Sequence, residues 1–265
     1  MILHASRLPR RLSRLSAVAG AASVSGEDEV ERKFRPTPGV RAQLARLGAP
    51  SRLSEFSDRY FDERSYRLTR RDCWLRRRDK TWELKSPQPP PKLGTEDAGA
   101  LVGVDYYRES RDWETIASIA ELLAGVRMAA PFPADAESAE AWLAARGMAL
   151  FANVRTSRER STLLLTRGHR VCVDLDSVAF FSTDDGAGSS PAVLSRYEIG
   201  EVELISAGGG ATPAEALADA FGQLGIGAEP VRGKLLELLS RHRPDHYEAL
   251  RESGLLEAKL GRGKG

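Results

Sequence analysis

The sequence predicts an α+β protein in which about eight mostly antiparallel strands close into a barrel, with helices packed outside it. Strand-like segments recur along the chain without the regular strand–helix alternation of a parallel sheet. Most of these segments place two charged side chains on one face and apolar side chains on the other. A barrel with a wet interior accommodates this pattern, because its charged faces point inward and its apolar faces pack against helices.

The predicted elements begin at residue 27. Pro36 and Pro38 end the first strand, and the turn at residues 79–80 joins two strands into a hairpin. The Pro-rich run 87–91 cannot lie inside a sheet and predicts an exposed loop, as does the Gly/Ser/Asp-rich segment 184–191. The predicted strands are 27–35, 53–63, 73–78, 81–85, 101–110, two or three within 148–167 and 170–181, and 194–206. The predicted helices are 40–47, 112–124, 135–146, 213–223 and 231–241, followed by a short helical tail.

Length and composition indicate a soluble globular protein with one large domain or two small ones. The 265 residues are 42% hydrophobic and 29% charged, which is enough to build a core. No apolar run approaches the roughly 20 residues that span a bilayer, so no membrane partner is expected. Cys73 and Cys172 lack the spacing of a zinc site or a disulfide framework, and we expect both to be small packing residues.

Residues 1–26 form a basic leader that we exclude from the fold. The leader contains four arginines, several serines and no acidic residue, and its leucines lie opposite its arginines when it is drawn as a helix. Although Pro9 interrupts that helix, the composition favours a mitochondrial transit peptide over a basic tail on a cytoplasmic protein. Outside the leader, which holds four of the 39 basic side chains, 35 basic side chains remain against 37 acidic ones. This balance does not favour nucleic-acid binding.

The stretch 29–34 shows the charged face most clearly. Glu29, Glu31 and Lys33 share one face of the predicted strand. Carboxylates are the ligands that Mg²⁺ or Mn²⁺ prefers, and a lysine beside them can hold a phosphate oxygen. Taken alone, the stretch is more typical of a solvated edge strand. The pattern recurs, however, in Arg76 and Arg78, Glu83 and Lys85, Asp174 and Asp176, and Glu201 and Glu203.

This recurrence predicts a charged interior that binds a polyphosphate together with divalent cations. Like charges on one strand repel each other when no ligand is present. Arginine side chains would clamp the phosphate oxygens and the carboxylates would hold the cations, so that both sets of charges are neutralised at once.

Five motifs occur in a fixed order along the chain. They are Glu29-Val-Glu-Arg-Lys-Phe, Trp74-Leu-Arg-Arg-Arg, Trp82-Glu-Leu-Lys, Val173-Asp-Leu-Asp and Gly200-Glu-Val-Glu. In this order they resemble the CYTH, or triphosphate tunnel metalloenzyme, family, most closely its thiamine triphosphatase branch. The resemblance runs over residues 27–250, including Lys234-Leu-Leu and Arg243-Pro-Asp-His-Tyr, and leaves 251–265 as a flexible tail.

The resemblance implies an eight-stranded antiparallel tunnel that uses Mg²⁺, with Mn²⁺ as an alternative, to remove the terminal phosphate of thiamine triphosphate. The implied triphosphate clamp consists of Lys33, Arg76, Arg78, Lys85, Arg158 and Lys234. The implied metal-binding set consists of Glu29, Glu31, Asp174, Glu201 and Glu203, with Glu109 on a facing strand as a further member. Arg155 and Arg160 offer registers that compete with Arg158 for its place in the clamp.

Two further roles follow from the same resemblance. Lys85 and Tyr60 would form an acid/base couple, and we expect crowding by other cations to lower the pKa of Lys85. Trp74 would either stack on the cationic thiazolium ring of thiamine or pack in the core. Trp82 is expected in the core.

Two other functions remain open. The same tunnel would suit an inorganic triphosphatase, and the loops 87–91 and 184–191 could reshape the mouth and its selectivity. A non-catalytic polyphosphate- or nucleotide-binding module would be marked by a lost metal ligand, and no ligand of the implied set is missing. We expect a monomer whose partner is a small-molecule triphosphate. His242 and His246 are expected on the surface, without a metal role, because Pro244 separates them.

Overall fold

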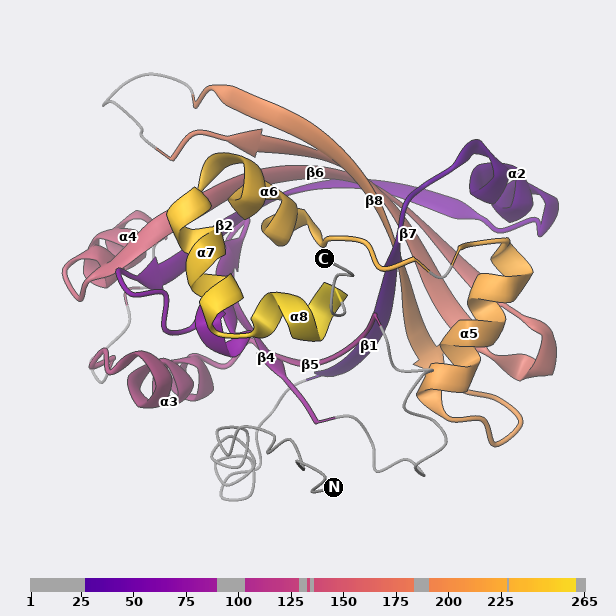
Figure 1. The fold of residues 1–265 in the computed structure, drawn as a ribbon, viewed down its shortest axis with the longest axis horizontal. Helices are drawn as coiled ribbons and strands as arrows, with labels where there is room; N and C mark the ends of the chain where they lie inside the picture. Colours follow the sequence, from indigo (N-terminus) through magenta and orange to yellow (C-terminus); the bar gives the residue numbers. More distant parts are fainter. Residues whose placement is uncertain are drawn as a thin grey trace, which may run out of the picture.

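The computed structural model describes residues 27–89, 103–128, 133, 136–183, 191–227 and 229–260. Eight antiparallel strands close into a barrel in the order β1-β5-β4-β3-β2-β6-β7-β8, with helices around it (Figure 1). This confirms the predicted fold class. The strands are β1 (Glu27–Phe34), β2 (Ser51–Glu63), β3 (Trp74–Arg78), β4 (Thr81–Pro87), β5 (Val104–Ser110), β6 (Met148–Leu164), β7 (Arg170–Phe181) and β8 (Val193–Ser206). The helices are α2 (Pro38–Arg46), α3 (Trp113–Ala124), α4 (Ala136–Ala144), α5 (Pro213–Leu224), α6 (Lys234–His242), α7 (Pro244–Glu252) and α8 (Leu255–Leu260), with short 3₁₀ turns η1 (Thr69–Arg71) and η3 (Thr166–Gly168).

Local signals in the sequence explain where several elements begin and end. The hairpin β3–β4 turns at Asp79, whose positive φ of 50° suits an aspartate in a tight turn. Helix α5 begins at a capping box formed by Thr212 and Glu215, and ends at Gly225, whose φ is 65°. The region 148–181 forms two strands, β6 and β7, joined through η3.

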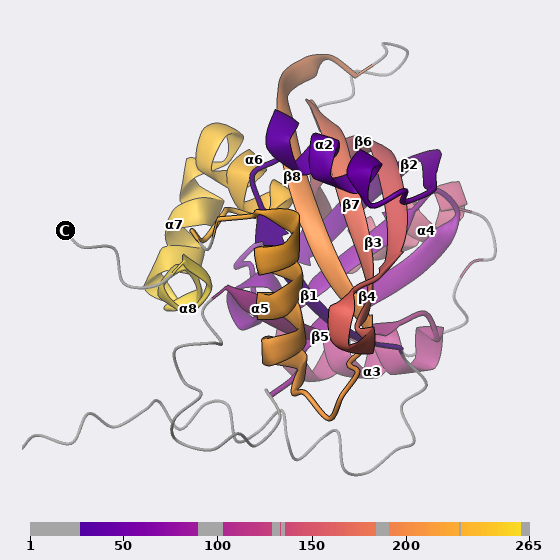
Figure 2. The same cartoon turned by 90° about the vertical axis from the view of Figure 1, so that its right-hand side faces the viewer.

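The outer face of the barrel is apolar and is covered by helices. Helix α5 lies along the wall formed by β1, β7 and β8, where Phe34 meets Phe221 edge to face with ring centroids 6.1 Å apart (Figure 2). Helix α3 covers β3 and β4, and Ile116 of α3 is buried in the same cluster as Leu84. The expected alternation of apolar outer and charged inner side chains therefore holds along these strands.

One end of the barrel is closed by the C-terminal helices. Helices α6, α7 and α8 lie across this end (Figure 1). The inward faces of β6, β7 and β8 change there from charged to apolar, and Val154, Val178 and Ile199 are buried with Leu239 of α6 in one cluster. The predicted flexible tail, residues 251–265, thus contains a packed helix, because Leu255 and Leu256 of α8 are buried in that same cluster.

Some sequence predictions needed correction at this end. Helix α6 begins at Lys234 instead of residue 231. His246 is not on the surface: it is 1% exposed, its Nε2 lies 2.7 Å from the Thr69 hydroxyl, and Tyr66 stacks on its ring at 3.7 Å. Burial, followed by the charge of Arg243, lowers the pKa of His246 to about 3, so the ring is neutral.

Other predictions were confirmed or lie outside the described residues. Cys73 and Cys172 are free and buried, as expected of packing residues. Trp82 is partly buried and packs against the cluster under α3. Pro87 was predicted in a loop but is the last residue of β4 and lies opposite Tyr107 of β5, so the loop begins after it. Most of the loop 184–191 and residues 90–91 lie outside the described residues. Within the described part of the chain, no helix has both the length and the apolar character needed to cross a membrane.

Gly200 should be essential for the barrel wall. A Cβ atom at this position would lie 2.1 Å from the ring of Phe34, which is 1% exposed and held by Phe221. We expect Gly200→Ala to lower the free energy of unfolding by about 1–3 kcal/mol, because the ring has no free space to enter. Urea unfolding monitored by circular dichroism measures this change.

Gly222→Ala is the matched control for this substitution. Gly222 lies in α5, where an added Cβ would meet nothing within 4 Å. Since alanine is the better helix former, we expect this variant to gain about 0.5–1 kcal/mol. A Gly200→Ala protein that unfolds at the same urea concentration as the wild type would contradict the packing argument.

Candidate active site

The barrel encloses a cavity of about 590 Å³, lined by inward-facing strand residues and by parts of α6 and α8. All of the predicted site residues except Asp174 line it. They are Glu29, Glu31, Lys33, Tyr60, Trp74, Arg76, Arg78, Lys85, Glu109, Arg158, Glu201, Glu203 and Lys234. Asp174 lies directly behind the lining, 2% exposed, with its carboxylate 2.5 Å from Arg158 and 2.7 Å from Arg160. The structure thus brings the predicted set together, while the individual roles stay predictions.

Strand register explains how acidic residues from distant parts of the sequence meet. In the β1–β8 pair, Glu31 lies opposite Glu203 and Lys33 lies opposite Glu201. In the β7–β8 pair, Asp174 lies opposite the same Glu201. Because opposite residues in an antiparallel pair point to the same face, these side chains share the barrel interior.

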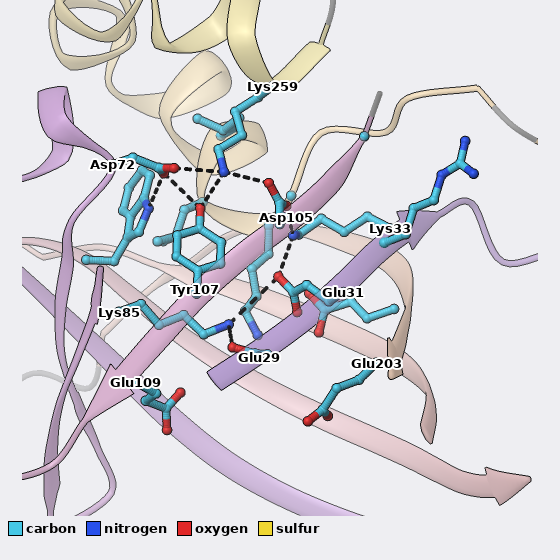
Figure 3. A pocket seen from close by; sticks show the side chains of 18 of the residues that line it. Glu29, Glu31, Lys33, Asp72, Lys85, Asp105, Tyr107, Glu109, Glu203 and Lys259 are labelled. Atoms are coloured by element: carbon cyan, nitrogen blue, oxygen red, sulfur yellow. Dashed lines mark hydrogen bonds and ion pairs between the residues drawn. The ribbon is translucent and has the colours of Figure 1, made fainter. Parts of the chain in front are cut away.

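Ion pairs connect the carboxylates to cations of neighbouring strands (Figure 3). The Lys33 ammonium lies 2.6 Å from both Glu31 and Asp105. The Lys85 ammonium lies 2.5 Å from Glu29 and 3.8 Å from Glu31. The carboxylates and cations therefore compensate one another across β1, β4 and β5.

Arginine side chains form further ion pairs, across β3, β4 and β5 and across β6, β7 and β8. Arg158 donates two hydrogen bonds to Asp176, at 2.7 and 2.6 Å, and one to Glu201 at 3.0 Å. The guanidinium of Arg76 lies 2.7 Å from Glu83 and 2.9 Å from Glu109, in a residue that is 5% exposed. These bidentate and shared contacts hold both guanidinium groups toward the cavity.

The register of β6 places both Arg158 and Arg160 toward the cavity. Arg155 points the other way and pairs with Glu55 at 2.7 Å on the exposed side. The clamp therefore has one more arginine available than the resemblance implied.

Lys234 reaches the cavity from the first turn of α6. Its ammonium lies 3.7 Å from Asp176, and its residue is 9% exposed. The preceding Gly233 allows the helix to approach the strand, because a Cβ there would lie 3.0 Å from the side chain of Lys33. The helix start therefore brings one more cation to the wall formed by the strands.

Burial and neighbouring charges shift the protonation equilibria of the site. Burial, and then the charge of Glu31, raise the pKa of Glu29 to about 7. Burial opposes the charged form of Lys33, but Asp105 and Glu31 outweigh it and hold the pKa of Lys33 well above its ordinary value. The site thus combines a carboxyl group that titrates near pH 7 with a lysine that stays protonated.

The prediction that cation crowding lowers the pKa of Lys85 was wrong. Burial does favour the neutral amine, but Glu31 and Glu29 outweigh it and raise the pKa of Lys85 above its ordinary value. The Tyr60 hydroxyl accepts a hydrogen bond from Arg76 at 3.5 Å. Lys85 is therefore protonated in this arrangement and can donate hydrogen bonds.

Several residues of the site were not predicted. Asp58, Asp105 and Tyr107 lie on strands at positions that alternate with recognised site residues, so the period of two could have found them. Asp72 lies after η1 and Lys259 on α8, outside the strands, and only the three-dimensional structure shows that both line the cavity.

The carboxylates of the cavity fit the donor chemistry of a hard divalent cation. Glu29 Oε2 is buried, and the Lys85 ammonium 2.5 Å away is the cation that a bound metal ion would replace beside it. Oxygen donors are the ligands that Mg²⁺ and Mn²⁺ prefer. With their present cationic partners, no three acidic, His or Cys side chains among the described residues converge on one point to hold a metal ion.

The raised pKa of Glu29 predicts a pH-dependent stability. From the unfolded value of 4.5 up to about 7, the folded protein keeps a proton that the unfolded chain releases, so stability from this group is lost as the pH rises. Glu29→Gln removes that loss. We therefore expect its stability relative to the wild type to increase by up to about 3 kcal/mol between pH 4.5 and 8.

Urea unfolding in EDTA at a series of pH values measures the effect. Glu121→Gln on the exposed side of α3 is the control, and its difference from the wild type should stay constant with pH. A Glu29→Gln profile parallel to that of the wild type would exclude a raised pKa at this position. Adding Mg²⁺ should reduce the effect if the ion binds the charged carboxylate.

The chain is similar to several known proteins. A sequence model described as "CYTH domain" matches residues 27–228. A protein of Homo sapiens named thiamine-triphosphatase is 31% identical over 233 residues, which are 84% of this chain and 89% of that protein. The Macaca fascicularis protein of the same name is 30% identical over the same shares of both chains. A solved structure of a Pyrococcus horikoshii OT3 protein is 17% identical, covers 81% of this chain and 99% of that chain, and has a TM-score of 0.48.

Proposed function

This chain belongs to the CYTH domain family, and on that premise we propose that it hydrolyses thiamine triphosphate to thiamine diphosphate and phosphate. The observation that carries the proposal is the closed-barrel cavity, in which cations and carboxylates from many strands face one another. The two relatives named thiamine-triphosphatase support the choice of substrate and the assignment as a phosphoanhydride hydrolase.

The cations of the cavity would bind the triphosphate. Phosphoryl transfer depends mainly on neutralising the charge of the phosphate oxygens and on holding the reacting groups in line. The lysine and arginine groups now pair with carboxylates, and phosphate oxygens would take over as their partners. The clamp would consist of Lys33, Arg76, Arg78, Lys85, Arg158 and Lys234, with Arg160 beside it.

The carboxylates released by this exchange would hold Mg²⁺, which would polarise the phosphate oxygens as a Lewis acid. The set that would hold it consists of Glu29, Glu31, Glu109, Asp174, Glu201 and Glu203. Lys85, whose pKa is raised, would stay protonated and stabilise the negative charge that develops on the leaving diphosphate. The Lys85–Tyr60 couple, the preference for Mg²⁺, the monomeric state and the mitochondrial location stay predictions.

The organic part of the substrate would lie at the apolar end of the cavity. Trp74 lines the cavity and belongs to the buried cluster, so that the two expectations for this side chain are compatible. Leu236 and Leu255 line the same end. An indole face beside aliphatic side chains suits a heteroaromatic cation, with a cation–π contribution of about 1–2 kcal/mol.

The full chain should release phosphate from thiamine triphosphate in a Mg²⁺-dependent reaction that is faster than the reactions with tripolyphosphate or ATP. Glu201→Gln should lower kcat by about 100-fold or more. The substitution removes a negative charge from the carboxylates that would hold Mg²⁺, and the same carboxylate pairs with Arg158 of the clamp. A phosphate-release assay with each substrate, in Mg²⁺ and in EDTA, measures both effects.

Glu121→Gln on the exposed face of α3 is the control and should retain activity. A preference for tripolyphosphate would discard the thiamine assignment and favour an inorganic triphosphatase. Tight triphosphate binding without turnover of any of the three substrates would instead favour a binding module.

A further inference from the structure

A lysine of the last helix reaches into the cavity at its apolar end. The Lys259 ammonium of α8 lies 2.5 Å from Asp105 and 2.8 Å from Asp72, and it donates a hydrogen bond to the Tyr107 hydroxyl at 2.6 Å (Figure 3). The same ammonium lies 4.5 Å from the centroid of the Tyr107 ring. Two carboxylates and an aromatic ring thus surround one positive charge.

The two carboxylates are held in place by other side chains. Trp74 Nε1 and the Tyr107 hydroxyl each donate a hydrogen bond of 2.8 Å to the same oxygen of Asp72. Asp72 follows η1 in the left-handed region with a φ of 60°, which brings its side chain back toward the barrel. Asp105 is fixed from the other side by Lys33 at 2.6 Å. The acidic groups are therefore preorganised independently of Lys259.

This arrangement suits a cation that is not part of the chain. Asp72 and Asp105 lie around the Tyr107 side chain, next to Lys33 of the clamp, in a part of the cavity that Trp74, Leu236 and Leu255 also line. A heteroaromatic cation could stack on the aromatic side chains and be neutralised by the carboxylates, whereas a phosphate group would be repelled by them.

We infer that Asp72, Asp105 and Tyr107 form a subsite for the cationic organic group of the substrate, and that Lys259 fills this subsite until that group displaces its ammonium. The inference rests on the proposed function for the nature of the substrate. It assigns to Lys259 the role of an internal competitor that keeps the two carboxylates paired when no substrate is bound.

Lys259 is suited to leave the subsite. It is carried by α8, a helix of six residues outside the sheet, and not by a strand of the barrel. Its side chain is flexible and its ammonium is readily hydrated, so that withdrawal toward solvent requires a change of rotamer and no rearrangement of the wall. Lys33, which shares Asp105, lies on β1 and would remain with the phosphate groups.

The exchange would select substrates by the charge of their organic group. A triphosphate that carries a cation can replace Lys259, while tripolyphosphate offers nothing to neutralise Asp72 and Asp105. Removing the Lys259 charge should therefore have opposite effects on the two substrates. Binding of the cationic one improves, and binding of tripolyphosphate weakens, because the carboxylates lose their positive partner.

Binding of thiamine itself to Lys259→Met tests the inference apart from turnover. We expect the full-length variant to bind thiamine several-fold more tightly than the wild type, as measured by calorimetry in EDTA. Lys80→Met, at the exposed β3–β4 turn, is the control and should bind thiamine as the wild type does. Adding Asp72→Asn to Lys259→Met should reverse the gain, because the cation loses its carboxylate while the Trp74 hydrogen bond can still form.

Hydrolysis assays give the second readout. In Lys259→Met the KM for thiamine triphosphate should fall several-fold while the KM for tripolyphosphate rises. If both KM values shift in the same direction by the same factor, the inference is overturned and Lys259 is a phosphate ligand. The inference is also overturned if a Lys259→Met protein with wild-type thermal stability binds thiamine no more tightly than the wild type does. If the wild type hydrolyses neither substrate, the proposed function fails, and thiamine binding alone decides the subsite.

Discussion

Compensation of buried charge is the constraint on which the rest of this structure depends. The interior of the barrel holds guanidinium, ammonium and carboxylate groups that are largely removed from solvent, and an unpaired buried charge costs several kcal/mol. Some charges have partners beyond the adjacent strand: Arg76 of β3 reaches Glu109 of β5, and Arg158 of β6 reaches Glu201 of β8, so that the curved wall of the barrel is needed to provide these partners. The alternation on the strands, the closure of the sheet and the apolar outer wall all follow from this requirement.

The same compensation explains how the cavity could accept a triphosphate without rearrangement of the barrel. The clamp cations already have anionic partners at 2.5–3.7 Å, such as Asp176 for Arg158 and Lys234 and Glu29 for Lys85. A polyanion bound with divalent cations can take the place of these internal partners, with phosphate oxygens on the basic side chains and metal ions on the acidic ones. The protein therefore meets its ligand with groups whose positions are fixed beforehand, which limits the entropy lost on binding.

The sequence was sufficient where a residue lies on a strand and the period of two applies. The inward direction of Glu29, Arg76, Asp174 and Glu201 was predicted correctly from their alternation alone. The period gave no information about residues in turns and in the C-terminal helices, and for that reason Asp72, His246 and Lys259 were missed or misplaced. The direction of the pKa shift of Lys85 could not be predicted either, because it depends on Glu29 and Glu31, which reach the Lys85 ammonium from another strand.

The cavity thus has two parts that are built in different ways. The part that we propose for the phosphate groups is carried mainly by strands, whose register fixes the spacing of the charges, with Lys234 added from α6. The part that we propose for the organic group combines strand residues such as Tyr107 with Asp72 after η1 and with the C-terminal helices. The turn η1 and these helices are joined by the buried contact of Thr69 with His246 and by the stacking of Tyr66 on the same ring. Since Asp72 directly follows η1 and Lys259 belongs to the helix after His246, this contact ties together the two ends of the proposed cation subsite. A change in η1 or in α7 and α8 could therefore alter which organic group is accepted while the strands keep the geometry of the phosphate groups.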